Sequence, residues 1–213
     1  MTSAAITSPT VASGDVSTEF FLAARAAKSI AWDIETSGLD WNTHLIGTVQ
    51  LALPNGTSTL VQISPDFIPP NLSTLLEFPG IVKIFHHAPF DLRFMANAWR
   101  VKPANVVCTK VLSRILFPER KKEEHSLKPL LEDVLGVHIT KSSVRTSDWT
   151  VSELSAEQIN YAVGDVLHLH RLFDALMEKA VSAGVAGLAE ASFGYIPVRV
   201  LTDLRRCGDV FAY

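Results

Sequence analysis

The clearest pattern in the chain is the alternation of apolar and polar positions over residues 29–35, which read SIAWDIE. Ile30, Trp32 and Ile34 occupy every second position, and Asp33 and Glu35 lie between and after them. In an extended chain, successive side chains point to opposite faces. The segment is therefore predicted to be a central strand with one buried apolar face and two carboxylates on the other.

Further apolar runs predict four more strands, over residues 45–53, 57–63, 81–85 and 105–109. The tripeptide Pro54-Asn55-Gly56 is a turn signal, so the first two of these strands are predicted to form a hairpin. Helices are predicted over residues 73–78, 89–99, 110–117 and 126–135, with Pro89 suited to a first helical turn. Because the early strands follow one another and the later ones alternate with helices, the pattern predicts an α/β fold with a mixed sheet.

A longer helix is predicted from residue 155 to about residue 182. It opens with Ser155 and Gln158, the two positions of a capping box. Tyr161 and Asp165 are four residues apart on this helix, so they are expected to share one of its faces. Each has a simpler interpretation when taken alone, since Tyr161 could be a core aromatic residue and Asp165 a surface residue.

The chain is predicted to have three parts. Residues 1–16, rich in Ser, Thr and Ala, are predicted to be a flexible leader, and residues 17–183 the main domain. Residues 184–213, interrupted by glycines and a proline, are predicted to be a C-terminal tail that packs on the domain or forms an oligomer contact.

Composition narrows the class of protein. Among the 213 residues 47% are apolar and 19% are charged, as in a globular protein, and no apolar run is long enough to cross a membrane. Two cysteines without neighbouring metal ligands favour a reducing cytoplasm. The net charge of −3 excludes a strongly basic nucleic-acid binder. Basic residues gather only at Arg120, Lys121, Lys122 and Lys128, which form either a solvated loop or a contact to phosphates.

The candidate chemistry is carried by carboxylates. Asp33 and Glu35 are like charges on a buried strand and repel each other unless a cation lies between them. Asp91 could merely stabilise the start of a helix, but it follows two histidines at the end of a predicted core strand, where α/β sheets place their sites. Carboxylate oxygens are the preferred ligands of hard divalent cations. The histidine spacing does not favour zinc, because His168 and His170 point apart on a helix.

Three stretches taken together carry a family resemblance: DIETSGL at residues 33–39, HHAPFDL at residues 86–92 and YAVGD at residues 161–165. In order and approximate spacing they resemble the DEDD superfamily of 3′→5′ exonucleases, in the subclass with tyrosine four residues before the last aspartate. Within it the chain is most similar to ribonuclease D. The resemblance implies a ribonuclease H-like exonuclease fold, with a five-stranded mixed sheet, its second strand antiparallel to the others, and helices on both faces.

The resemblance also implies a mechanism with two Mg²⁺ or Mn²⁺ ions. Asp33 would bridge both ions, Glu35 and Asp165 would complete the site that activates water, and Asp91 would support the second ion. The Tyr161 hydroxyl would orient the attacking water. The expected reaction trims single-stranded 3′ ends of RNA and releases nucleoside 5′-monophosphates.

Four further residues are expected to contact substrate from their motif positions. Leu39 and Phe90 would pack against the terminal bases, and Thr36 and His87 would hold the 3′ end. Position 87 departs from the superfamily, which often has Asn there. Three alternatives remain at this stage: an exonuclease that acts on DNA, an inactive nucleic-acid-binding protein on the same fold, and an α/β domain whose acids never converge.

Overall fold

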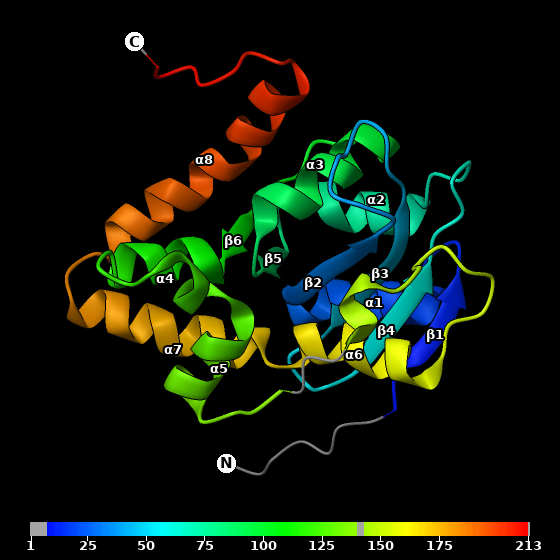
Figure 1. Cartoon of the computed structure of the whole chain (residues 1–213), viewed down its shortest axis with the longest axis horizontal. Coiled ribbons are helices and arrows are strands. Elements are labelled where there is room, and N and C mark those ends of the chain that lie inside the picture. The colour runs from blue at the N-terminus through cyan, green and yellow to red at the C-terminus, as the bar shows by residue number, and fades with distance from the viewer. Residues whose placement is uncertain (1–7, 140–142, 213) are drawn as a thin grey trace.

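The computed structural model describes residues 8–139 and 143–212, and its centre is a six-stranded mixed sheet in the order β1-β4-β3-β2-β5-β6 (Figure 1). The strands are β1 Thr10–Ser13, β2 Ser29–Thr36, β3 Ile46–Ala52, β4 Ser58–Gln62, β5 Val82–Phe85 and β6 Val106–Cys108. β3 runs antiparallel to both of its neighbours, whereas the other pairs are parallel. The mixed α/β sheet and its antiparallel second predicted strand are confirmed.

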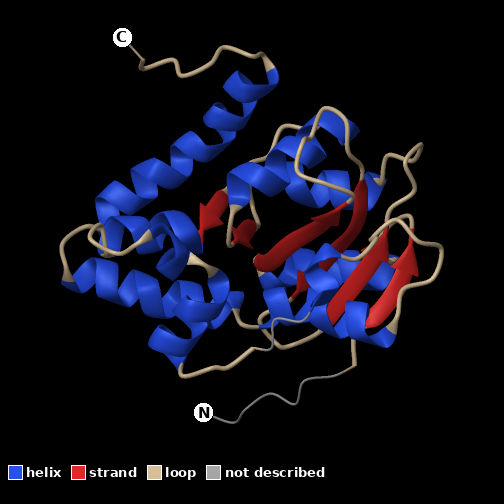
Figure 2. Ribbon diagram, viewed as in Figure 1, coloured by secondary structure: helices blue, strands red, loops and turns tan. Residues whose placement is uncertain are grey.

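Helices lie on both faces of the sheet and extend beyond one edge of it. They are α1 Thr18–Ala27, α2 Pro70–Glu77, α3 Ala88–Trp99, α4 Thr109–Leu116, α5 Leu127–Leu135, α6 Ala156–Leu167, α7 Leu169–Ser182 and α8 Ala186–Leu204, with short 3₁₀ helices η1 Lys122–His125 and η2 Ser143–Thr146. Figure 2 shows most of the strands in one half of the molecule, and α4, α5, α7 and α8 packed together in the other. Among the described residues, no helix combines the length and the apolar character that crossing a membrane requires.

The sixth strand corrects the predicted leader. Residues 10–13 pair in parallel with β4 at the edge of the sheet, and residues 1–7 lie outside the described residues. Asp15 then joins this segment to α2, because its carboxylate accepts hydrogen bonds from the backbone N–H groups of Asn71 at 2.7 Å and Leu72 at 3.0 Å. The strand was missed because it is mostly exposed, so its polar side chains give no apolar signal.

The single helix predicted over residues 155–182 is two helices that meet at His168. The capping box of Ser155 and Gln158 is present as predicted. α6 packs on β2, β3 and β4, whereas α7 packs mainly on α4 and α5. No proline or glycine lies at His168 to cause the break. The two helices instead change direction because they pack on different surfaces, α6 on the sheet and α7 on other helices.

The C-terminal segment is largely one helix. α8 packs against α3, α4 and β6, and Phe193, Ile196 and Val200 are buried in this contact. This last helix crosses the helical half of the molecule diagonally (Figure 1). Its outer face exposes Leu188 and Val198. The oligomer contact through this segment stays a prediction.

Candidate active site

The first two acids come from the end of the central strand β2. Trp32 and Ile34 face the core and are buried, so the alternation places Asp33 and Glu35 together on the opposite face. The neighbouring strand supplies their cross-strand partners, since Asp33 pairs with Gln50 in the sheet register and Glu35 with Thr48. The sheet therefore holds both carboxylates at a fixed position.

α6 brings the third acid to this position. It packs across β2, β3 and β4, and Asp165 lies one turn after Tyr161 on it. Carboxylate oxygens of Asp33, Glu35 and Asp165 all lie within 4.8 Å of one another, and the three residues are partly buried. The alternative of an α/β domain with dispersed acids is therefore excluded for these three residues.

Asp33 is the most constrained of the acids. Burial raises the pKa of its carboxyl well above the usual range, and three negative neighbours raise it further, in the order Asp91, Glu35 and Asp165. A hydrogen bond of 2.8 Å from Gln50 Nε2 to Asp33 Oδ2 acts in the opposite direction. A bound cation would offset the part of this pKa shift that comes from the neighbouring carboxylates.

Asp91 lies beside this group but is not part of it. It is buried in the first turn of α3, and its Oδ1 accepts a hydrogen bond of 3.3 Å from the backbone N–H of Ile34. Burial raises the pKa of Asp91 to about 8. Since Asp91 also raises the pKa of Asp33, all four predicted acids lie in one region, with Asp91 set back against the strand.

The donor set fits a divalent metal ion. Three carboxylates offer only oxygen ligands, which suit Mg²⁺ and Mn²⁺ rather than zinc. The buried Asp33 makes the arrangement electrostatically unfavourable without a cation, as its raised pKa shows. Metal binding would let these carboxylates ionise together at neutral pH.

Tyr161, one helical turn before Asp165 on α6, packs against a small hydrophobic cluster. Its ring lies 6.0 Å from that of Trp149, which is buried. Gln158 fixes the segment that carries Trp149, because its side-chain amide donates to Ser147 Oγ at 3.0 Å and to the carbonyl of Asp148 at 2.9 Å. The capping box that begins α6 thus also positions the ring that contacts Tyr161.

A glycine allows this segment to lie against the sheet. A Cβ atom built on Gly47 of β3 would come within 2.3 Å of the backbone oxygen of Trp149. Backbone atoms cannot easily move away from such a contact. Gly47 therefore permits the close packing that places Trp149 and Tyr161 over β3.

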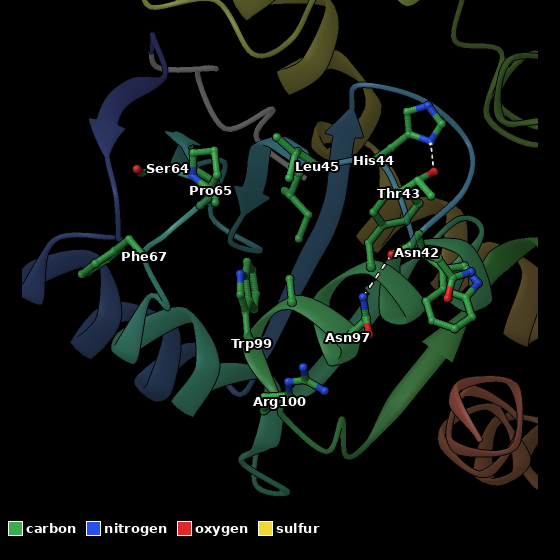
Figure 3. A pocket seen from close by; sticks show the side chains of 15 residues that line it. Asn42, Thr43, His44, Leu45, Ser64, Pro65, Phe67, Asn97, Trp99 and Arg100 are labelled. Atoms are coloured by element: carbon green, nitrogen blue, oxygen red, sulfur yellow. Dashed lines mark hydrogen bonds between the residues drawn. The ribbon is translucent and has the colours of Figure 1, made fainter. Parts of the chain in front are cut away.

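Two of the predicted substrate contacts lie at the end of β2. Thr36 is the last residue of the strand, and Leu39 lies in the loop that follows. The side chain of Leu39 is 83% exposed, and the Thr36 hydroxyl donates a hydrogen bond of 2.6 Å to the carbonyl of Gly38. The loop is tied to α3 by a bond of 3.1 Å from Asn97 Nδ2 to the carbonyl of Trp41, drawn in Figure 3. Leu39 is thus presented to solvent by an ordered loop.

The pocket in Figure 3 lies between this loop, the end of β4 and the end of α3, and has a volume of about 290 Å³. Trp41, His44, Phe67, Trp99 and Arg100 are among its lining residues. None of the predicted site residues lines it. The pocket is therefore separate from the acid cluster.

The other two predicted contacts begin α3. His87 is the N-cap residue of the helix, and its ring stacks on that of Phe90 with centroids 6.2 Å apart. Burial lowers the pKa of His87 to about 4, and four cations lower it further: Lys110, Arg93, Arg114 and Lys122. The imidazole is therefore neutral at physiological pH, and a positively charged region lies beside it.

Two polar residues of the site were not predicted from the sequence. Gln50 and Thr48 are completely buried in β3, and the Thr48 hydroxyl donates to Gln50 Oε1 at 3.1 Å, which orients the amide toward Asp33. Their signal was visible in the run LIGTVQLAL, where two polar residues alternate within an otherwise apolar strand. His125 is also buried, although its position before a predicted helix favours a surface or capping residue.

Comparison with known proteins agrees with this geometry. A family model described as 3′-5′ exonuclease matches residues 10–180. Ribonuclease D from Gluconacetobacter diazotrophicus is 31% identical over 137 residues, which are 64% of this chain and 34% of that protein. Ribonuclease D from Musicola paradisiaca is 30% identical over 161 residues, 76% of this chain and 42% of that protein. The chain thus spans less than half the length of these curated relatives.

Solved structures extend the similarity to nearly the whole chain. Brucella melitensis NrnC matches with a TM-score of 0.89 and 33% identity, over 97% of this chain and 98% of that one. The same protein has been solved bound to pGG and with bound Mg²⁺. Escherichia coli RNase D, at 24% identity and a TM-score of 0.74 over 85% of this chain and 47% of that one, shares the ribonuclease H-like fold. The chain therefore belongs to the 3′-5′ exonucleases of the DEDD superfamily.

Proposed function

We propose that this protein is a metal-dependent 3′→5′ exoribonuclease that trims single-stranded RNA from its 3′ end and releases nucleoside 5′-monophosphates. The observation that carries the proposal is the convergence of Asp33, Glu35 and Asp165, whose oxygens lie within 4.8 Å of one another. Asp165 is far from Asp33 and Glu35 in the sequence, and such a group of oxygens is costly to assemble unless a cation uses it.

Each residue has a proposed role in the reaction. Asp33, Glu35 and Asp165 would hold the divalent ions, and Asp91 would support them from its position against β2. Bound ions of this kind activate water and stabilise the leaving oxygen of a phosphodiester. The Tyr161 hydroxyl, held on α6 beside Trp149, orients the water for in-line attack.

The substrate is proposed to be an RNA end or a short oligoribonucleotide. NrnC, similar over nearly its whole length, has been solved bound to pGG, which supports an oligonucleotide of this kind. Leu39 and Phe90 would pack on the terminal bases, since one is exposed in an ordered loop and the other stacks with His87. Thr36 and the neutral His87 would hold the 3′ end. A cytoplasmic location is supported by Cys108 and Cys207, which are both free thiols.

The test is a trimming assay on RNA oligonucleotides labelled at the 5′ end. With Mg²⁺ or Mn²⁺ we expect a ladder of products that shorten one nucleotide at a time, with nucleoside 5′-monophosphates released and no cleavage in EDTA. The Asp165→Asn variant is the inactive control. Matched DNA oligonucleotides in the same assay test the alternative of a DNA exonuclease. Wild-type protein that leaves all 3′ ends intact, and that Mn²⁺ does not stabilise, would support the inactive binding protein instead.

A further inference from the structure

Two polar side chains lie on one face of β3, the strand next to the one that carries Asp33. Thr48 and Gln50 both have an exposed fraction of 0%, although every other residue of this strand is apolar or glycine. Burying a hydroxyl and an amide costs free energy, which hydrogen bonds return only in part. Apolar side chains of similar shape would fill the same space, so the pair needs an explanation beyond stability.

The two residues form a chain of hydrogen bonds that ends at the acid cluster. The Thr48 hydroxyl donates to Gln50 Oε1 at 3.1 Å, and Gln50 Nε2 donates to Asp33 Oδ2 at 2.8 Å. An ionised carboxylate only accepts hydrogen bonds, so the amide nitrogen must face Asp33 and the amide oxygen must face Thr48. The hydroxyl then stabilises this orientation of the amide, because it donates to the amide oxygen.

The sheet fixes where the chain of hydrogen bonds begins and ends. In the register between β2 and β3, Asp33 lies opposite Gln50 and Glu35 lies opposite Thr48. On the other side of β3, Gln50 lies opposite Leu60 of β4, which is completely buried. α6 also packs on these three strands. The Gln50 side chain is therefore enclosed and is held beside Asp33.

A fixed amide restricts the carboxylate that it contacts. The last torsion of an aspartate side chain is broadly distributed, so a carboxylate without a fixed partner can rotate. A hydrogen bond to Oδ2 selects one orientation of the Asp33 carboxylate, within the group of oxygens that lie within 4.8 Å of one another. A carboxylate oxygen has two lone pairs, so Oδ2 can accept this bond and still bind a cation. Hydrogen-bond partners of this kind commonly orient metal ligands.

We propose that Gln50 and Thr48 are positioning residues, which hold the Asp33 carboxylate in the orientation that binds a divalent cation. Neither residue touches the cation or the substrate in this proposal, and both act through Asp33. The inference rests on the proposed function, which makes Asp33 a metal ligand. It deepens that function, because metal affinity then depends on two neutral side chains that add no charge to the site.

Four variants test the proposal. Gln50→Met keeps an unbranched side chain of similar length and removes both hydrogen bonds. Thr48→Val keeps the shape of the side chain and removes the donor to the amide, whereas Thr48→Ser retains a hydroxyl. Thr59→Val is the matched control, since Thr59 is a buried threonine of β4 whose hydroxyl donates to the carbonyl of Thr10 at 3.2 Å. Thr59 lies opposite Leu51, on the other face of the sheet.

The first measurement is calorimetric binding of Mn²⁺ to the protein without RNA. Gln50→Met should raise the Kd for Mn²⁺ about 10- to 100-fold, as is usual when a residue that orients a metal ligand is lost. Thr48→Val should raise it about two- to tenfold, the value of one neutral hydrogen bond. Thr48→Ser should restore most of this loss, and Thr59→Val should leave the Kd within about twofold of wild type. Unchanged affinity in Gln50→Met, or an equal loss in Thr59→Val, would overturn the proposal.

The second measurement is the trimming rate of 5′-labelled RNA as a function of Mg²⁺ concentration. The loss of rate in Gln50→Met should shrink as Mg²⁺ is raised, because a higher concentration compensates for weaker binding. A residue that only stabilises the fold would lower the rate by the same factor at every Mg²⁺ concentration. That outcome would contradict a positioning role for Gln50.

Failure of the proposed function gives a different result. Wild-type protein that binds Mn²⁺ but trims no RNA would refute the exonuclease activity, and the Mn²⁺ affinities of the variants would still decide the role of Gln50 and Thr48. Wild-type protein that binds no Mn²⁺ would refute the metal site itself. Thermal melting in EDTA verifies that the variants are folded. If Gln50→Met does not fold, the difference in Mn²⁺ affinity between Thr48→Val and Thr48→Ser decides the proposal.

Discussion

The acid cluster and a basic pocket lined by Arg114, Pro118, Arg120, Lys122 and His125 are both charged sites, but the protein builds them in opposite ways. Asp33 lies on the central strand and Asp91 is packed against it, and burial raises the pKa of both carboxyls above the ordinary range. In the basic pocket, Arg114 and Lys122 lie at the surface of the helical half. A buried charge can be sustained only by a strong partner, whereas an exposed charge costs little. The acid cluster therefore needs a compensating charge, whereas the exposed cations of the pocket do not.

The largest effect is expected at Asp33, in the acid cluster. Asp33→Asn should lower the single-turnover trimming rate by at least about 1,000-fold, because one of the oxygen ligands becomes a neutral amide. Without metal the same variant should be as stable as wild type or more stable, since it removes a buried like charge. Rate and thermal melting in EDTA are measured together. Near-normal turnover would refute the metal assignment.

Tyr161 sharpens the comparison, because its proposed role is at the acid cluster although it is not one of the acids. Tyr161→Phe should slow trimming about 100-fold, since the water loses its orienting hydroxyl while the ring stays packed against Trp149. The increase in melting temperature caused by Mn²⁺ should remain. A variant that loses this increase would show that the hydroxyl contributes to metal binding instead.

Stability in EDTA should depend on pH through the acid cluster. The folded pKa of Asp91, about 8, lies above its unfolded value near 4, so its contribution is complete below about pH 4 and is lost as the pH rises through 8. His87 and His170, with pKa values of about 4, affect stability only below about pH 6.5. The free energy of unfolding should thus fall by up to about 2 kcal/mol from pH 6.5 to pH 8. Chemical denaturation should give a shallower fall for Asp91→Asn and none with saturating Mg²⁺.

The sequence pattern predicted most helices and strands, because the signals for these elements lie within short segments of the chain. The alternation around Asp33 gave β2, and Ser155 with Gln158 gave the start of α6. The exposed strand β1 and the break at His168 were missed, because an edge strand needs no apolar face and a helix can end where its packing surface ends. Gln50 and the buried His125 were missed because a polar residue in the core is chosen by a partner distant in sequence.

The sequence alone determined which residues are the candidates for the chemistry. Three short motifs contain Asp33, Glu35, Asp91, Tyr161 and Asp165, and their residue types already indicate a divalent metal. Only the tertiary structure decided which of their oxygens meet, that Asp91 is set back against the strand, and that Arg114, Arg120 and Lys122 line one pocket. The physical reason is that residue type and local spacing are properties of the chain, whereas distances between remote side chains arise from packing of the sheet and helices.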